Sequence, residues 1–215
     1  MENDAVLLTL GQWFSPSYPL GSFAYSHGLE TVIQRGGIST AAQLEVWLRD
    51  LLVHGSGQAD AILLRAAHAC RDRDAVTLID AVARAYAPSA ERLFESTAQG
   101  TAFARTTRTI WKIDIPDLTH PVAAGYASGQ LGIPADLTVL FYLQAFASNL
   151  VSCAVRLVPL GQTEGQAVLH ALGAACHAVA DATRGVPPDA LFSSCFAAEI
   201  AAMHHETLEH RIFRT

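Results

Sequence analysis

Lysine is almost missing from this chain of 215 residues, and charge of either sign is scarce. The charged fraction is 16%, Lys112 is the single lysine, and the 14 basic residues form no cluster against a net charge of −6. Nucleic-acid binding needs concentrated positive charge, because attraction to the phosphates dominates the affinity. The sequence therefore indicates that nucleic acid is not a partner.

Cysteine is also rare, and its spacing excludes a disulfide scaffold and a zinc ribbon. Cys70, Cys153, Cys176 and Cys195 lie far apart, without a Cys-x-x-Cys pair. This spacing is typical of reduced, buried thiols in a cytosolic protein. The N-terminus, residues 1–4, is acidic and lacks the basic segment of a signal peptide, so we expect a cytoplasmic protein.

Common catalytic motifs are absent as well. The sequence has no phosphate-binding Gly-rich loop, no dinucleotide fingerprint, no His-Glu-x-x-His and no Gly-x-Ser-x-Gly. The nearest acid/base pair is His27 with Glu30, and pairs at this spacing usually form helix-surface contacts. The nearest cluster of metal ligands is His204 to His210, where neighbouring residues on a helix point about 100° apart. We expect no catalysis, no cofactor and no metal site; a small helical enzyme or metal-binding protein using these residues is the alternative.

One uncharged run, residues 137–155, approaches the length that spans a membrane. It contains several polar side chains and is followed directly by Arg156. A helix that is apolar on all sides is also typical of the centre of a helical bundle. We interpret the run as a core helix and expect no membrane association.

The abundant residues favour helices. Hydrophobic residues make up 51% of the chain, alanine is plentiful, and alternating β-branched runs are scarce. Glycine and proline breakers predict an all-α, single-domain bundle of about eight to ten helices over residues 1–215. The clearest helix follows a capping box at Thr40 and Gln43. Further predictions are a helix over 4–14, a helix from Phe23 to about Arg35 with Ser22 as N-cap, close packing at Gly100, a second capping box at Thr163 and Gln166, and a last helix from near Asp189 toward His210.

The stretch from Pro19 to Glu30 is unusual for a surface helix because it combines glycine, aromatic and charged residues. If residues from Phe23 onward are helical, Gly28 lies in mid-helix, where glycine costs about 1 kcal/mol relative to alanine. Ala24 and Gly28 then form a shallow groove that another backbone can approach closely. We interpret this stretch as a docking surface.

The C-terminal tail is the second unusual feature. It places Arg211, Phe213 and Arg214 at the end of the chain, where domains commonly fray into small polar residues. Aromatic and arginine side chains are frequent anchors of interfaces. The tail is therefore expected to bind a partner, and the alternative is that Phe213 packs on its own domain.

Three stretches resemble the UreF-type urease accessory proteins. The early stretch is similar to the family motif Pro-x-Gly-x-Phe-x-Tyr-Ser-x-Gly-Leu-Glu. In the middle of the chain, Gln144-Ala145, Asn149 and the run from Leu157 to Thr163 also resemble the family. The tail resembles Met-Arg-His-Glu-Thr-x-x-x-Arg-Leu-Phe-Arg-Ser, with His204 in place of the usual arginine and Glu209 where tyrosine is common. The resemblance covers nearly the whole chain.

This resemblance implies an all-α, non-catalytic homodimer that binds the UreD/UreH accessory protein and, through the joint complex, the GTPase UreG. The assembly would deliver nickel, together with carbamylation of the active-site lysine, to apo-urease. Residues 1–20 and 204–215 are expected to be mobile until a partner binds. The residues expected to bind partners are Phe23, Tyr25, His27, Glu30, His205, Glu206, Arg211, Phe213 and Arg214.

Overall fold

The computed structural model describes residues 2–215, with side chains from Asp4 onward. This part of the chain contains ten α-helices, two short 3₁₀ helices and no strand, which confirms the predicted all-α bundle. The elements in chain order are α1 (Glu2–Trp13), η1 (Ser22–Ala24), α2 (Leu29–Gln34), α3 (Ala41–His54), α4 (Ser56–Ala69), α5 (Arg73–Ala85), α6 (Ala90–Trp111), α7 (His120–Gln130), α8 (Ala135–Leu157), α9 (Gln162–Ala182), η2 (Pro188–Ala190) and α10 (Phe196–His205).

The centre of the bundle is the close packing of α7 against α4 and α6. A Cβ atom on Gly125 would lie 2.1 Å from the carbonyl oxygen of Leu64 in α4. A Cβ atom on Gly100 of α6 would likewise lie 2.0 Å from the carbonyl oxygen of Leu118, just before α7. These two glycines have no side chain to separate the backbones, which confirms the close packing expected at Gly100.

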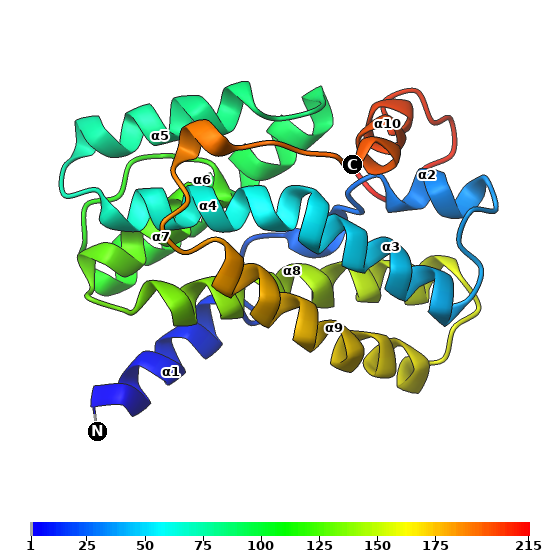
Figure 1. The fold of residues 1–215 in the computed structure, drawn as a ribbon, viewed down its shortest axis with the longest axis horizontal. Helices are drawn as coiled ribbons and strands as arrows, with labels where there is room; N and C mark the ends of the chain where they lie inside the picture. The colour runs from blue at the N-terminus through cyan, green and yellow to red at the C-terminus, as the bar shows by residue number, and fades with distance from the viewer. Residues whose placement is uncertain (1) are drawn as a thin grey trace.

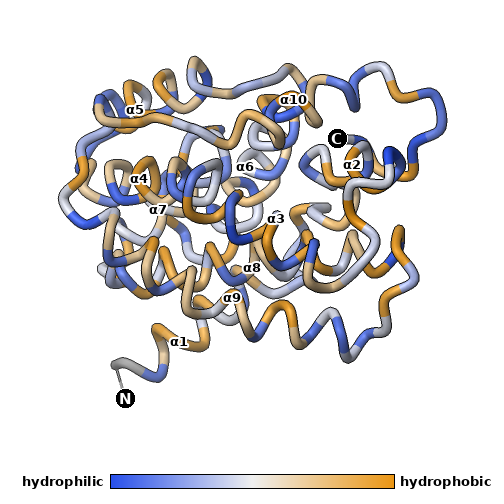
Figure 2. Tube along the Cα trace, turned by 45° about the vertical axis from the view of Figure 1, so that its right-hand side comes forward, coloured by the Kyte–Doolittle hydropathy of each residue, from blue (hydrophilic) through white to orange (hydrophobic). Residues whose placement is uncertain are grey.

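Helix α8 has the length and composition of a membrane span, but half of its most apolar window is buried inside the fold. It lies within the bundle beside α9 (Figure 1), and apolar residues recur along it (Figure 2). Val139, Leu143 and Ala154 are fully buried there. These features are typical of the core helix of a soluble protein.

Aromatic side chains attach the N-terminal segment to the bundle. Trp13 is fully buried, with its ring edge-on to Phe103 at 5.1 Å and to Trp111 at 5.4 Å between centroids. Tyr18 donates to or accepts from the Thr107 hydroxyl at 2.9 Å. The predicted helix over 4–14 is present as α1, whereas the mobility predicted for residues 1–20 stays a prediction.

Local capping explains which other helices agree with the prediction. The Thr40/Gln43 capping box is present at the start of α3. Helix α9 differs: it begins at Gln162, and Glu164 accepts the Gly161 N–H at 2.8 Å, so the predicted box at Thr163 and Gln166 is wrong. Glycine has no side chain with which to complete a reciprocal box.

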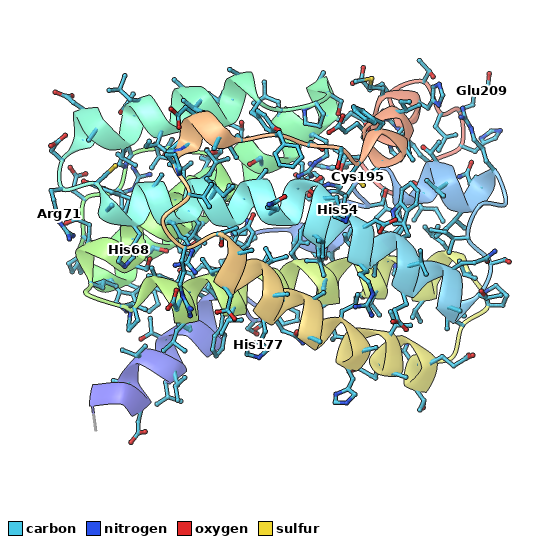
Figure 3. The ribbon with its side chains drawn as sticks, in the orientation of Figure 1. His54, His68, Arg71, His177, Cys195 and Glu209 are labelled. Carbon is cyan, nitrogen blue, oxygen red and sulfur yellow. The ribbon has the colours of Figure 1, made fainter. Side chains whose placement is uncertain are left out.

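The last helix also begins later than predicted. Residues 188–190 form a single 3₁₀ turn, and the chain then runs extended to Phe196, where α10 begins. In this segment Ser194 N–H donates to the carbonyl oxygen of His54, the last residue of α3, at 3.0 Å. Figure 3 shows the labelled His54 and Cys195 close together at this crossing. The predicted start near Asp189 is wrong because this long-range contact replaces helical hydrogen bonds.

Candidate functional site

The chain turns sharply within the stretch expected to be one helix. Residues 22–24 form a 3₁₀ turn, Tyr25 is extended, and His27 and Gly28 both have left-handed backbone, with φ of 59° and 76°. Two consecutive left-handed residues are incompatible with a right-handed α-helix. The prediction of a helix from Phe23, with Ser22 as its cap and Gly28 in its middle, is therefore wrong.

Gly28 nevertheless allows the close approach that the sequence indicated. A Cβ atom at this position would lie 2.6 Å from the backbone nitrogen of Ala202 in α10. The approaching backbone belongs to the same chain, and α2 and α10 pack against each other, with the C-terminus next to α10 (Figure 1). The early motif and the tail thus form one structural unit.

Glu30 is the acceptor at the centre of this unit. Its carboxylate is fully buried and accepts the backbone N–H of Ile212 at 2.7 Å and of Phe213 at 3.0 Å. The same carboxylate lies 3.1 Å from Nε2 of His205. A buried carboxylate needs such partners, because an unpaired one costs several kcal/mol. Glu30 therefore fixes the tail to α2.

His205 connects three elements. It is the last residue of α10 and is fully buried, with Nε2 toward Glu30 of α2 and Nδ1 2.8 Å from Glu91 at the start of α6. The other oxygen of Glu91 accepts from the Arg211 guanidinium at 2.6 Å. Glu206 extends the connection, because its carboxylate accepts the Ala90 N–H at 3.1 Å.

The end of the tail is held mainly by its backbone. Thr215 O accepts from both the N–H and the hydroxyl of Ser26 at 2.6 Å, and Arg214 N–H donates to Ala24 O at 2.8 Å. The Thr215 hydroxyl donates to Glu95 at 2.9 Å. Phe213 is 2% exposed, so the alternative in which it packs on its own domain is the observed arrangement.

A cation–π contact covers the buried Phe213 ring. The guanidinium carbon of Arg156, on α8, lies 4.5 Å from the ring centroid. Arg156 also donates to Phe23 O at 3.0 Å. Arg156 therefore joins the tail to the first turn of the early motif.

The nine predicted site residues divide into two groups by exposure. Five are buried and hold the unit together: Tyr25, His27, Glu30, His205 and Phe213. Four are exposed around it: Phe23, Glu206, Arg211 and Arg214. Sequence reasoning missed Glu91 and Arg156, for which no local pattern gave a signal, and Ser26, which the early motif contains.

The alternative acid/base pair is not supported, because His27 and Glu30 point to different partners. Nε2 of His27 lies 2.8 Å from the Ser56 hydroxyl of α4, and its ring packs edge-on against Phe146 at 5.2 Å. Nδ1 has no hydrogen-bond partner among the described residues. Burial, and secondarily the positive charge of Arg92, lowers the pKa of His27 well below its ordinary value.

The histidines near the C-terminus do not converge either. Nδ1 of His204 faces Arg35 at 2.6 Å, whereas His205 is buried between carboxylates and His210 is exposed. Figure 3 shows His177 on α9, remote from α10, and its neighbour Cys176 is buried while His177 is exposed. Among residues 2–215, no group of three or more His, Cys, Asp or Glu side chains is arranged to hold a metal ion.

A separate cavity of about 480 Å³, lined by both apolar and polar residues, lies between α8, α6 and the loop after α1. Asp60, Arg92, His120 and Tyr142 are among the residues that line it. Tyr142 donates to Asp60 at 2.7 Å, and burial raises the pKa of Asp60 to about 6. Burial also lowers the pKa of His120 to about 4, and its Nε2 has no hydrogen-bond partner among the described side chains.

Comparison with known proteins identifies the family. The UreF family pattern matches residues 38–173. The chain is 52% identical to the urease accessory protein UreF of Roseobacter denitrificans over all of this chain and 96% of the relative. It is 50% identical to the protein of that name from Cereibacter sphaeroides strain KD131, over 98% of this chain and 99% of the relative, and 44% identical to that of Ruegeria pomeroyi, over 97% and 96%. With this family match and these full-length relatives, the chain belongs to the UreF family.

Proposed function

We propose that this chain is a cytoplasmic, non-catalytic scaffold for urease maturation, acting as a homodimer. In this proposal it links the UreD/UreH accessory protein to the UreG GTPase, so that nickel is inserted into apo-urease. The names of the full-length relatives support a role in urease maturation. The specific partners are those implied by the family resemblance, and the chain itself needs no cofactor for this role.

One observation carries the proposal: two segments almost 200 residues apart form a single surface. Phe23 from the early motif is 68% exposed, and its carbonyl is bound by Arg156, whose guanidinium covers the tail residue Phe213. Arg211 and Arg214 are exposed on the same tail. An exposed aromatic beside arginines is a common arrangement at protein interfaces. We propose that this surface binds the UreD/UreH protein.

The buried residues have a supporting role in this proposal. Glu30, His205 and Phe213 lie beneath the surface and bind the tail, so they would set its shape while the exposed side chains contact the partner. Tyr25 and His27 are buried in the same turn. Substitution of the buried group should therefore weaken partner binding indirectly, through loss of tail position.

The direct test is activation of apo-urease with purified UreD, UreG, GTP, nickel and bicarbonate, with and without this chain. Addition of the chain should raise urease activity, and unchanged activity would remove the proposed function. Light scattering coupled to size exclusion tests the homodimer in the same preparation.

Binding to UreD/UreH tests the surface itself. Phe23→Ala and Arg211→Ala should each weaken binding about tenfold or more, the effect typical of an interface anchor. Val46→Ala is the matched control, because Val46 is 61% exposed on α3 but lies outside the proposed surface. If the two variants and the control bind equally well, this surface is not where UreD/UreH binds.

A further inference from the structure

The cavity between α8, α6 and the loop after α1 has a charged inner end. Asp60 of α4, Arg92 and Glu95 of α6 and His120 of α7 line it there, beside Tyr142 of α8. Arg92 and Glu95 form an ion pair with each other, so their charges largely cancel. His120 is uncharged at neutral pH, because burial lowers its pKa to about 4. The charge that remains at this end is that of Asp60.

Asp60 has no cation of its own. Its carboxylate accepts a hydrogen bond from the Tyr142 hydroxyl at 2.7 Å and forms no ion pair with any residue that the structure describes from Asp4 onward. Burial raises its pKa to about 6, so the carboxylate is the main form above that pH. A carboxylate in a poorly solvated cavity is stabilised by a cation that pairs with it. The inner end therefore favours a positively charged ligand.

The remaining charged residue of the cavity lining lies at the other end. Arg156 is about four turns further along α8 than Tyr142, which corresponds to about 21 Å. Its guanidinium donates to Phe23 O and covers the Phe213 ring. This separation exceeds the Debye length of about 8 Å at physiological salt, so Arg156 has little effect on the inner end.

Aromatic side chains form the wall next to Asp60. The rings of Phe14 and Tyr142 lie edge to face with 6.0 Å between centroids, and Phe146 lines the cavity one turn after Tyr142. Such rings pack against an alkyl chain and attract a cation through their π-faces. A metal ion fits less well, because no group of three or more His, Cys, Asp or Glu side chains among residues 2–215 is arranged to hold one. The lining thus matches a small organic cation.

We propose that the inner end of this cavity binds a short primary alkylammonium ion, with the Asp60 carboxylate as its counter-ion and the rings of Phe14, Tyr142 and Phe146 around its alkyl chain. The cavity of about 480 Å³ has the volume of a small-molecule site. This inference goes beyond the proposed scaffold function and requires none of its partners.

Isothermal titration calorimetry of the full chain with n-butylammonium chloride tests the site. At about pH 7.5 and about 0.15 M salt, non-specific attraction to the net charge of −6 is screened. One ion should bind per chain. The uncharged n-butanol has the same alkyl chain and should bind at least about tenfold more weakly, the effect of losing one charge-assisted hydrogen bond.

A variant tests the counter-ion itself. Asp60→Asn removes the charge but keeps an oxygen that can accept from Tyr142. It should weaken binding of n-butylammonium at least about tenfold. Asp50→Asn is the matched control, because Asp50 is exposed on α3, and it should bind n-butylammonium as the wild type does. Circular dichroism of both variants reports whether the fold is intact.

Equal binding of n-butylammonium to the wild type and to folded Asp60→Asn would overturn the inference. So would equally tight binding of n-butanol and n-butylammonium to the wild-type chain, a comparison that decides even if Asp60→Asn does not fold. Absence of saturable n-butylammonium binding would overturn it as well. These titrations omit UreD, UreG and urease, so their failure is distinguishable from failure of the scaffold function.

Discussion

Replacement of Asp60 by asparagine should stabilise this protein at neutral pH. Burial raises the pKa of Asp60 from 3.8 to about 6, so the folded state disfavours the carboxylate. A tenfold change in an ionisation constant is worth about 1.4 kcal/mol, which gives about 3 kcal/mol for this change. Asp60 also lines the cavity, and solvent reaching it would screen part of this penalty, so we expect a gain of about 2 to 3 kcal/mol for Asp60→Asn.

The gain should depend on pH in a defined direction. Between 3.8 and about 6 the folded state holds the Asp60 proton and the unfolded state does not, so wild-type stability falls as pH rises through this range. The advantage of Asp60→Asn is therefore complete above about pH 6 and absent below about pH 4. Tyr142 can still donate to the amide oxygen of asparagine, which preserves the contact observed at 2.7 Å.

The same experiment should also report the effect of the lowered pKa of His120 on the free energy of unfolding. Its pKa falls from 6.5 to about 4, so the unfolded state binds the proton first and stability drops on acidification between these values. In the wild-type chain this slope opposes that of Asp60, whereas in Asp60→Asn it is unopposed by Asp60 and has the same sign as the slope from His27, whose pKa burial also lowers. The variant should lose stability more steeply on acidification than the wild type.

Urea unfolding followed by circular dichroism, at several pH values and one fixed protein concentration, measures both effects. Asp50→Asn is the control, because Asp50 is exposed on α3 and should change stability by less than about 0.5 kcal/mol. A destabilised Asp60→Asn at neutral pH, or a stability difference that does not vary with pH, would refute the reasoning.

Further predictions concern close backbone contacts and thiol reactivity. Gly28→Ala should cost more stability than Gly36→Ala by at least about 2 kcal/mol in thermal or urea unfolding: both have left-handed φ, but only the Cβ at position 28 meets the α10 backbone. Gly100→Ala should destabilise α6 against the turn before α7, whereas Gly173→Ala, with open space around its Cβ, should stabilise α9 by about 0.5 to 1 kcal/mol. Cys153 should resist alkylation at about pH 8 until the protein unfolds, since burial raises the pKa of its thiol to about 12.

The parts of the fold that follow from local chemistry could be predicted from the sequence. Thr40 and Gln43 bond each other across one helical turn, so their pairing can be read from four residues. The start of α10 could not be read in this way, because Ser194 bonds to His54, 140 positions earlier. The left-handed backbone of His27 was equally hidden, since residues other than glycine seldom adopt it and the surrounding packing imposes it.

The sequence predicted which residues belong to the site better than it predicted how those residues contact one another. The sequence identified Glu30, His205 and Arg211 as site residues, but the contacts of His205 and Arg211 with Glu91 depend on the tail folding back onto α6. No spacing within a segment encodes such a contact. The sequence indicated a docking surface with aromatic anchors, and the structure buries Tyr25 and Phe213 beneath it.

The bonds from Glu30 to the tail have a consequence for sequence variation. Glu30 accepts main-chain N–H groups of residues 212 and 213, which every amino acid except proline supplies. The side chain of Ile212 is 65% exposed and takes no part in that bonding. The residue type at position 212 can therefore vary while the tail stays bound to Glu30. A proline at this position would remove the backbone N–H that donates to Glu30, and no other part of the tail replaces that hydrogen bond.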